Sequence, residues 1–327
     1  MEGVIMKIIK YLMVKLFSHI PRVSSFLEII LTPEFILIVM LGVSNISYAN
    51  YSKITESGEY VVIEEDKNAV HERIKKEKQG IYAISLYKPS YFLPVYYSTR
   101  PDTAIYLNNT PNNQSIQPFD AKLQFSFKVP VWQNIFSDAS DLYLAYTQFS
   151  YWQAYNHSAF FRETDYEPEI YLANNIDGPF LPGWKFNFLN LGLAHQSNGK
   201  GAKLERAWER AYLEAILSNE NWMVSLKPWY PIREATARHY NPDIAKYLGY
   251  GRLLVSYKHN DQVFSLEVRN AAESRFKRGA IQADWSLPLT KHISGYMQIF
   301  SGYGQSLIEY NHYTNAVGIG IALNRWI

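Results

Sequence analysis

The chain has 327 residues, and its 32 basic and 30 acidic residues leave a formal net charge of only +2. This length is enough for one large β domain or two ordinary domains, and the near-neutral charge gives no basic patch that would favour nucleic acid as a partner. The chain lacks cysteine, which excludes disulfides, thiolate metal sites and thiol catalysis. Aromatic residues make up 16% of the chain, a share typical of proteins at membrane interfaces.

The first 49 residues have the order of a secretory signal. Basic residues between Lys7 and Arg22 precede the apolar run 35–43, and Ser47-Tyr-Ala49 supplies small residues at a plausible cleavage point. The apolar run is too short for a membrane-spanning helix. We therefore expect residues 1–49 to be a signal peptide, with a later translation start or a buried helix as the alternatives. Residues 50–90 are charged and poorly patterned, which predicts a periplasmic N-terminal segment without chemistry.

Alternation of apolar and polar residues dominates the rest of the chain. Between residues 121 and 129, Leu123, Phe125, Phe127 and Val129 share one face, while lysine, glutamine and serine occupy the other. This period of two predicts a β-strand with one apolar face. Similar strands are expected at 91–97, 141–150, 167–174, 183–197, 206–217, 221–230, 245–257, 262–270, 279–287, 291–300 and 313–325.

The strands number about twelve, an even number that suits single-chain outer-membrane barrels. Short links such as 177–179, 219–221 and 259–261 alternate with longer polar links at 156–167, 198–205 and 233–243. Periplasmic turns and extracellular loops produce this alternation. We predict an all-β fold, a twelve-stranded antiparallel transmembrane β-barrel over residues 91–327, in the outer membrane of a Gram-negative cell. A soluble β-sandwich is the alternative, because its strands alternate in the same way.

One strand carries polar groups on its apolar face. Leu189, Leu191 and Leu193 share the face expected to meet lipid, and the next two members of the row are His195 and Ser197. Two residues that are two apart on a strand point the same way. A lone histidine there would more simply mark the point where the strand leaves the membrane.

The following strand favours a catalytic interpretation. Its outward row is apolar except for Glu209, and a link symmetric about Ala202 would place Glu209 directly opposite His195. Opposed residues lie about 5 Å apart, within reach of a carboxylate that holds an imidazole. The set Ser197, His195 and Glu209 thus has the residue types of a hydrolytic triad, and lipid would reach it sideways from the bilayer.

The motif His195-Gln-Ser-Asn-Gly199 resembles the H-x-S-N-G block of the outer-membrane phospholipase A family. The resemblance runs in order from about residue 90 to residue 327. Further blocks similar to the family are Tyr146–Gln153, Phe161–Glu169, Asn221–Val224, Lys227–Tyr230, Asn241–Tyr250, Tyr303–Asn311 and Val317–Gly320.

This resemblance implies a dimeric barrel that needs Ca²⁺ and hydrolyses acyl ester bonds of membrane phospholipids or lysophospholipids, with A1 and A2 activity. It implies Ser197 as nucleophile, His195 as general base and the Gly199 N–H as an oxyanion donor. Glu209 stands where the family usually has asparagine. A carboxylate can both orient the histidine and stabilise its protonated form, so we expect activity to survive.

The resemblance also implies a calcium site and a dimer interface. The calcium ligands would be the Lys200 carbonyl, the Glu205 side chain and a carbonyl from Ser158 of the partner subunit. Glu205 replaces the serine that is usual in the family, and an anionic oxygen is the better ligand for a hard cation. Gln148 matches a glutamine in the family's dimer interface.

Other residues are interpreted as structural. Trp152, Trp222 and Trp229 are expected in the aromatic girdles, and Arg162 with Glu163 as an ion pair in the lumen. Two alternatives remain open. One is a catalytically impaired barrel that acts as a porin or adhesin, favoured only by the substitutions at Glu205 and Glu209. The other is a soluble secreted esterase, which would expose the leucine row to water.

Overall fold

The computed structural model describes residues 84–323 apart from 233–239, 271–273, 275–276 and 291–292. The described residues belong to one compact unit, Ile63–Ile327. The predicted signal peptide, and all but the last seven residues of the predicted periplasmic segment, lie outside the described residues.

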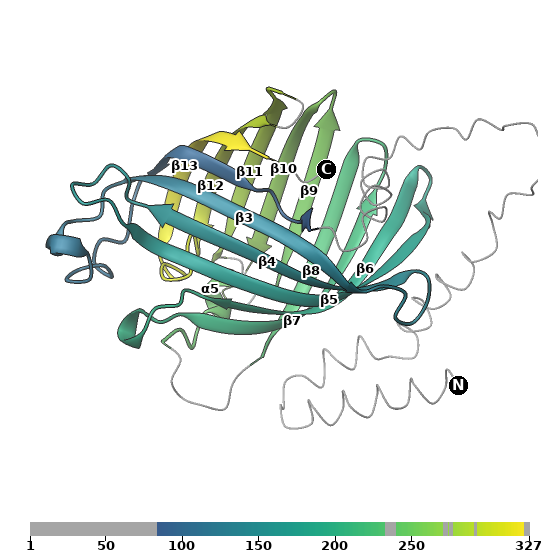
Figure 1. Ribbon diagram of the computed structural model, residues 1–327, viewed down its shortest axis with the longest axis horizontal. Helices are drawn as coiled ribbons and strands as arrows, with labels where there is room; N and C mark the ends of the chain where they lie inside the picture. Colours follow the sequence, from purple (N-terminus) through teal and green to yellow (C-terminus); the bar gives the residue numbers. More distant parts are fainter. Residues whose placement is uncertain (1–83, 233–239, 271–273, 275–276, 291–292, 324–327) are drawn as a thin grey trace, which may run out of the picture. The chain divides into compact units, whose positions relative to one another are not determined.

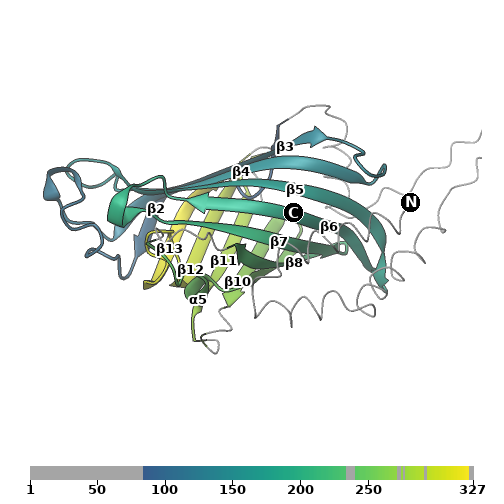
Figure 2. The same ribbon diagram turned by 90° about the horizontal axis from the view of Figure 1, so that it is seen from below.

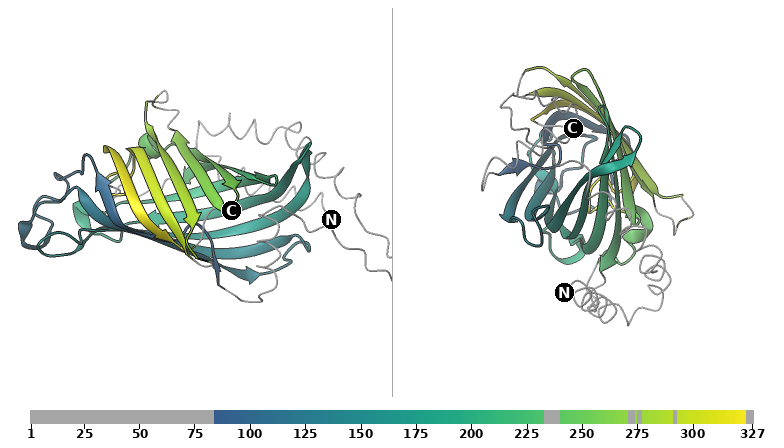
Figure 3. Two further views of the ribbon diagram at one scale, coloured as in Figure 1. Left: turned by 90° about the horizontal axis from the view of Figure 1, so that it is seen from above. Right: turned by 90° about the vertical axis from the view of Figure 1, so that its right-hand side faces the viewer.

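Twelve antiparallel strands form one sheet that closes on itself, because β2 pairs with both β13 and β3. Figure 1 shows β3, β4 and β5 in front of β9, β10 and β11, on the opposite wall of the barrel, and the right-hand view of Figure 3 looks at the strands from one end. The strands are β2 (Tyr91–Ser98), β3 (Phe119–Trp132), β4 (Ser140–Trp152), β5 (Phe161–Leu181), β6 (Trp184–Ser197), β7 (Ala207–Ser218), β8 (Trp222–Ile232), β9 (Gly251–His259), β10 (Gln262–Asn270), β11 (Gly279–Pro288), β12 (Ser294–Tyr303) and β13 (Tyr313–Ala322).

Four short elements complete the described part of the chain. The two-residue strand β1 (Ser85–Leu86) pairs with β3 just beyond the end of β2. The others lie in links between strands: the 3₁₀ helices η1 (Pro111–Asn113) and η2 (Ala202–Leu204), and the helix α5 (Ala245–Leu248).

The outer surface of the barrel is apolar on every strand. On β6, Leu191 and Leu193 are 47% and 52% exposed, whereas Asn190 and Ala194, which flank them in the chain, are buried. Each of the twelve strands contributes at least one exposed large apolar residue: Phe92, Phe125, Leu144, Ile170, Leu191, Leu213, Leu226, Leu253, Phe264, Ile281, Ile299 and Val317. An apolar belt of this extent is unfavourable in water but suits hydrocarbon. The closed, lipid-facing ring confirms the predicted transmembrane barrel and excludes the sandwich.

In the part of the chain that the structure describes, no helix is both long and apolar enough to cross a bilayer.

The lumen is filled by buried polar side chains that join strands on different walls. Lys227 on β8 pairs with Glu169 on β5 at 2.9 Å, and Glu169 also accepts from Lys88 at 2.7 Å. Lys122 on β3 donates to Gln298 on β12 at 2.6 Å. A cavity of about 150 Å³ remains among these groups. Buried charges are tolerated here because each has an opposite charge or a hydrogen-bond partner.

Short and long links alternate around the ring, as predicted. The long links include 99–118, 153–160 and 198–206, and Figure 2 shows the loops 99–118 and 198–206 at the same end of the barrel. We call this end the long-loop end. The tight turns 182–183 and 260–261 lie at the opposite end.

Two of the predicted links on β5 were wrong. Residues 161–167 belong to β5 rather than to a loop, because their charged side chains, including Asp165 and Glu167, point into the polar lumen instead of into solvent. The expected turn at 177–179 is a bulge inside β5, where Asp177 has φ 39° and the register with β6 shifts.

The predicted strand 245–257 was wrong over its first residues. Ala245–Leu248 form α5, which buries Ile244 and Leu248 on one face, as their spacing of four allows. The helix ends at Gly249, whose φ of 75° is a conformation that glycine adopts readily. Strand β9 begins only at Gly251.

Candidate active site

The hairpin of β6 and β7 brings the predicted histidine and glutamate together. His195 is directly opposite Glu209 in the β-ladder, and Ser197 is opposite Ala207. The Nδ1 atom of His195 lies 2.8 Å from Oε1 of Glu209. Since a carboxylate oxygen can only accept a hydrogen bond, Nδ1 carries the proton and donates the hydrogen bond to Glu209. Nε2 is then the unprotonated, basic nitrogen of the imidazole.

Both side chains reach the outer surface of the barrel. The His195 side chain is 42% exposed and that of Glu209 is 26% exposed, and they continue the outward row of Leu191 and Leu193. Ser197 is half-buried on the same row. Within the described residues, the Ser197 hydroxyl makes no hydrogen bond, so the structure places it beside His195 without a direct contact between them. The three groups are therefore accessible from the lipid side.

Asn198 fixes the loop that follows Ser197. Its buried side chain donates to the Leu204 carbonyl at 2.8 Å and to Glu163 Oε1 at 3.0 Å, and it accepts from the Arg206 N–H at 3.0 Å. This residue is part of the H-x-S-N-G motif, but sequence reasoning assigned it no role. Its contacts turn the loop inward and leave Ser197 at the outer rim.

Gly199 adopts a backbone conformation that other residues rarely adopt. Its φ is +63°, and a Cβ atom there would lie 3.0 Å from the ring of Tyr166. Tyr166 is itself the β5 partner of Ser197. The glycine thus lets the backbone pass close to the aromatic ring beside the serine.

The predicted calcium ligands lie on two loops of the long-loop end. Lys200 and Glu205 are on the loop 198–206. Lys200 sends its ammonium group inward, to the Arg162 carbonyl at 2.6 Å and to Glu163 at 3.3 Å. The Glu205 carboxylate is partly exposed and has no ion pair within the described part of the chain. Carbonyl oxygens and a carboxylate form the donor set that Ca²⁺ prefers, so these residues fit the ion.

Ser158 is on the loop 153–160 and is clamped by one side chain. Its N–H donates to Gln114 Oε1 at 3.1 Å, and its carbonyl accepts from Gln114 Nε2 at 2.7 Å. Among the described residues, no group of three or more His, Asp or Glu side chains could hold a metal ion.

Gln148 lies on the outer face of β4, half-buried between two partners. It accepts from the Tyr146 hydroxyl at 2.9 Å and donates to Ser150 Oγ at 3.2 Å. The second amide hydrogen of Gln148 has no partner within the described residues. An amide on the lipid-facing row gains from any further polar partner that reaches it.

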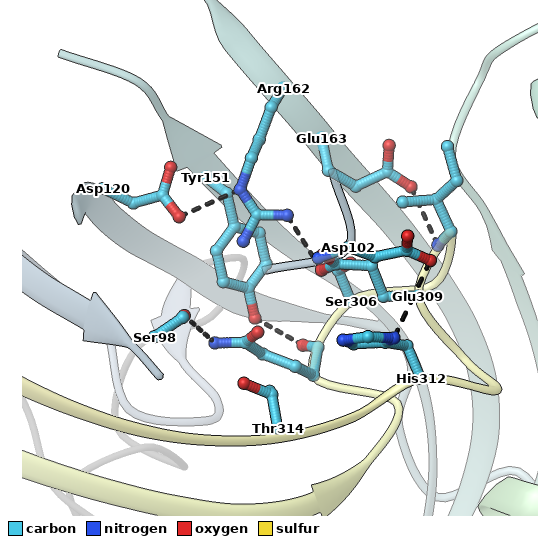
Figure 4. Close-up of polar contacts among 12 residues, drawn as sticks. Ser98, Asp102, Asp120, Tyr151, Arg162, Glu163, Ser306, Glu309, His312 and Thr314 are labelled. Atoms are coloured by element: carbon cyan, nitrogen blue, oxygen red, sulfur yellow. Dashed lines mark hydrogen bonds and ion pairs between the residues drawn. The ribbon is translucent and has the colours of Figure 1, made fainter. Parts of the chain in front are cut away.

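A buried ion network supports the loops from inside the barrel. Figure 4 shows Arg162 between Asp120, at 2.9 Å, and Glu309, at 2.8 Å. Glu163 turns instead to Lys200 and to the backbone N–H of Ile308.

The predicted pair of Arg162 with Glu163 is therefore wrong. A bulge against β4 lets both side chains point inward, toward separate partners. Burial raises the pKa of Glu309, but the adjacent Arg162 guanidinium, together with hydrogen bonds from Ser306 and the Asp102 N–H, holds the pKa below its usual value.

The aromatic girdle prediction holds for two of the three tryptophans. Trp222 is exposed and contacts Tyr257, and Trp152 stacks on Phe161 near the long-loop end. Trp229 is buried in the lumen, where its indole N–H donates to the Gly249 carbonyl at 2.9 Å. Residues of β8 face lipid and lumen in turn, and Trp229 is one of those that face the lumen.

The fold and these groups define a class of protein: a transmembrane β-barrel that presents serine, histidine and a carboxylate to the surrounding lipid. Comparisons with known proteins narrow the class. Residues 67–323 match the family described as Phospholipase A1. The chain is 38% identical over 224 residues to the phospholipase A1 of Klebsiella pneumoniae, a match that covers 65% of this chain and 76% of that protein. It is 39% identical over 207 residues to the phospholipase A1 of Escherichia coli K12, covering 63% and 70%.

Solved structures agree with the sequence comparisons. The fold matches the outer membrane phospholipase dimer of Salmonella typhi with bound calcium, with a TM-score of 0.69, 33% identity, and coverage of 74% of this chain and 93% of that one. An active-site variant of the Escherichia coli outer membrane phospholipase A, in which asparagine is replaced by alanine, matches with the same score. The chain belongs to the phospholipase A1 family, and it is accordingly a phospholipase of the outer membrane.

Proposed function

We propose that the protein hydrolyses acyl ester bonds of phospholipids and lysophospholipids, of A1 and A2 type, with Ser197, His195 and Glu209 as a catalytic triad. The 2.8 Å contact between His195 and Glu209 on the lipid-facing row carries this proposal. It holds the imidazole with Nε2 free, on the same face as the serine hydroxyl.

The reaction follows from this arrangement. The Ser197 hydroxyl oxygen attacks the ester carbonyl carbon while its proton moves to Nε2 of His195. The tetrahedral intermediate then collapses, and the ester C–O bond breaks as His195 returns the proton to the leaving alcohol of the lysophospholipid. Water, deprotonated by His195, releases the fatty acid from Ser197. Glu209 stabilises the protonated imidazole in both steps.

Stabilisation of the oxyanion falls to the loop after Ser197. The Gly199 N–H is the proposed donor from the backbone. When bound, Ca²⁺ would supply a Lewis acid that polarises the ester carbonyl. The Lys200 carbonyl and the Glu205 carboxylate would hold it, together with the carbonyl of the partner subunit's Ser158. The clamp of Gln114 on Ser158 would keep that carbonyl in a fixed direction.

Two copies of the chain are needed for this set of ligands. The Salmonella typhi relative is a dimer with bound calcium. We place the dimer contact on the outer face of β4, where Gln148 has an amide hydrogen left over. In lipid, pairing of this amide with its symmetry mate is favourable.

Replacement of the serine tests the proposal. The Ser197→Ala variant should release fatty acid from phospholipid–detergent micelles at least about 10³-fold more slowly, and still show the heat-dependent gel mobility of a folded barrel. Ser301→Ala is the matched control, because Ser301 lies on the outer row of β12 near the same end and contacts Tyr313 rather than the triad. Full activity of Ser197→Ala would refute the assignment.

A further inference from the structure

The start of β7 reaches past the described part of its ladder with β8. Within the described residues, that ladder ends at the pair Glu209–Ile232, while β7 continues to Ala207. Toward β6, Arg206 exchanges hydrogen bonds with Asn198, so the backbone groups of Ala207 face the other way. These groups face away from β6 at the point where β7 lies opposite Ser197.

One side chain pairs with both backbone groups of Ala207. The Ala207 N–H donates to Oδ1 of Asn241 at 3.2 Å, and the Ala207 carbonyl accepts from Nδ2 of Asn241 at 2.8 Å. Asn241 is 3% exposed. Its amide therefore reproduces both hydrogen bonds that a neighbouring residue of a strand would make.

The segment that carries Asn241 is anchored in the mouth of the barrel. The Asn241 carbonyl accepts from the Ile244 N–H at 3.2 Å, and Asp243 accepts from the Tyr310 hydroxyl at 2.6 Å. Ile244 and Leu248 pack in the same buried cluster as Trp208 and Trp229. Because the segment is held by several independent contacts, Asn241 is a fixed point for β7.

We propose that Asn241 is a positioning residue for the triad. By holding Ala207 it keeps the last residues of β7 in register with β6, so that Glu209 stays opposite His195 and Ser197 stays on the same face. The inference rests on the proposed function of Ser197, His195 and Glu209. Displacement of a catalytic group by about 1 Å can cost about 10²-fold in rate, which makes a remote clamp relevant to catalysis.

Asn241→Leu tests the inference, because leucine keeps the side-chain volume and removes both hydrogen bonds. We expect kcat for micellar phospholipid to fall about 10–100-fold with KM nearly unchanged. Asn241→Asp keeps the acceptor for the Ala207 N–H and loses the donor, so its kcat should lie between those of Asn241→Leu and the parent. Asn241→Asp tests the inference if Asn241→Leu does not assemble into a barrel.

A control and a double-mutant cycle separate positioning from general stability. Trp229→Phe removes the hydrogen bond to Gly249 at the other end of the same segment, and its kcat should stay within about threefold of the parent. In a Glu209→Ala background, Asn241→Leu should cost less than it does alone, because Asn241 acts through Glu209.

Three results would overturn the inference: an unchanged kcat of Asn241→Leu, an equal loss in Trp229→Phe, or a fully additive cycle. Failure of the proposed function looks different, because the Ser197→Ala variant would then keep its activity whatever happens at Asn241.

Discussion

Replacement of Glu209 separates the two contributions of the proposed triad carboxylate, its charge and its orientation of the histidine. Glu209→Gln keeps an oxygen acceptor of the same reach for Nδ1 of His195 and removes the charge. Glu209→Ala removes both. The relative from Escherichia coli has an active-site asparagine that was studied by replacement with alanine. In the present chain, Glu209 and the Glu209→Gln variant allow a carboxylate and an amide to be compared at the same position of one barrel.

The contribution of the charge follows from Coulomb's law. Unit charges about 4 Å apart interact by about 4 kcal/mol at an effective dielectric constant of about 20, and by about 1 kcal/mol in bulk water. The His195 and Glu209 side chains are 42% and 26% exposed, so solvent screens the pair and places the value near the lower limit. We take about 1–2 kcal/mol, which corresponds to a loss of about 5–30-fold in kcat for Glu209→Gln. Glu209→Ala also loses the orientation of the histidine, so its kcat should fall about 10²–10⁴-fold.

The assay is fatty acid release from micellar phospholipid at saturating calcium, with heat-dependent gel mobility as the check on folding. The parent, Glu209→Gln and Glu209→Ala should rank in that order, with a gap at each step. Equal rates for the glutamine and alanine variants would refute the orienting role. Activity of Glu209→Ala within about threefold of the parent would remove Glu209 from the triad altogether.

Two further predictions concern the proposed calcium site and the lumen. Glu205→Gln should weaken binding of Ca²⁺ or Tb³⁺ about 10-fold or more, measured by calorimetry or lanthanide luminescence. The control Glu220→Gln, in the turn at the opposite end of the barrel, should leave binding unchanged. Equal ion affinities of the parent and Glu205→Gln would exclude Glu205 as a ligand. Glu309→Gln should lower the barrel's melting temperature at neutral pH, because Arg162 loses one of two buried carboxylates, at a cost of about 3 kcal/mol. The pKa of Glu309 in the folded barrel lies below its usual value, so the ionised carboxylate stabilises the fold fully above about pH 4.3. This stabilisation is lost as the pH falls through the lower, folded-state pKa. The melting temperatures of parent and variant should therefore converge in acid. A gap that stays constant down to about pH 3 would contradict this account.

Much of the barrel follows from the sequence because lipid imposes a strict alternation on each strand. The leucine row of β6 was evident from residues 189–193 alone, and the link 198–206 set the register that opposes His195 and Glu209. Both features are local: they need only the period of a strand and the length of one loop. The same alternation gave a wrong prediction for the start of β5. Its lumen-facing carboxylates, among them Asp165, have the composition of a solvent-exposed loop.

The supports of the site could not be predicted, because they join residues far apart in the chain. Asp120, Arg162 and Glu309 meet only after the ring has closed. Asn241 lies 34 residues from Ala207, in the predicted polar link 233–243. Each contact depends on how neighbouring loops fold into the barrel mouth, and no periodicity in the sequence encodes that.

The ion pairs across the lumen bear on whether the barrel can also conduct. Barrels of about 16–18 strands leave an aqueous channel, whereas those of about eight strands are filled by side chains. With twelve strands, the outcome depends on the interior, and here Glu169 is held by both Lys88 and Lys227 in the middle of the ring. A permeating ion would have to separate buried pairs at a cost of several kcal/mol each. The ion pairs across the lumen therefore oppose the passage of ions through the barrel.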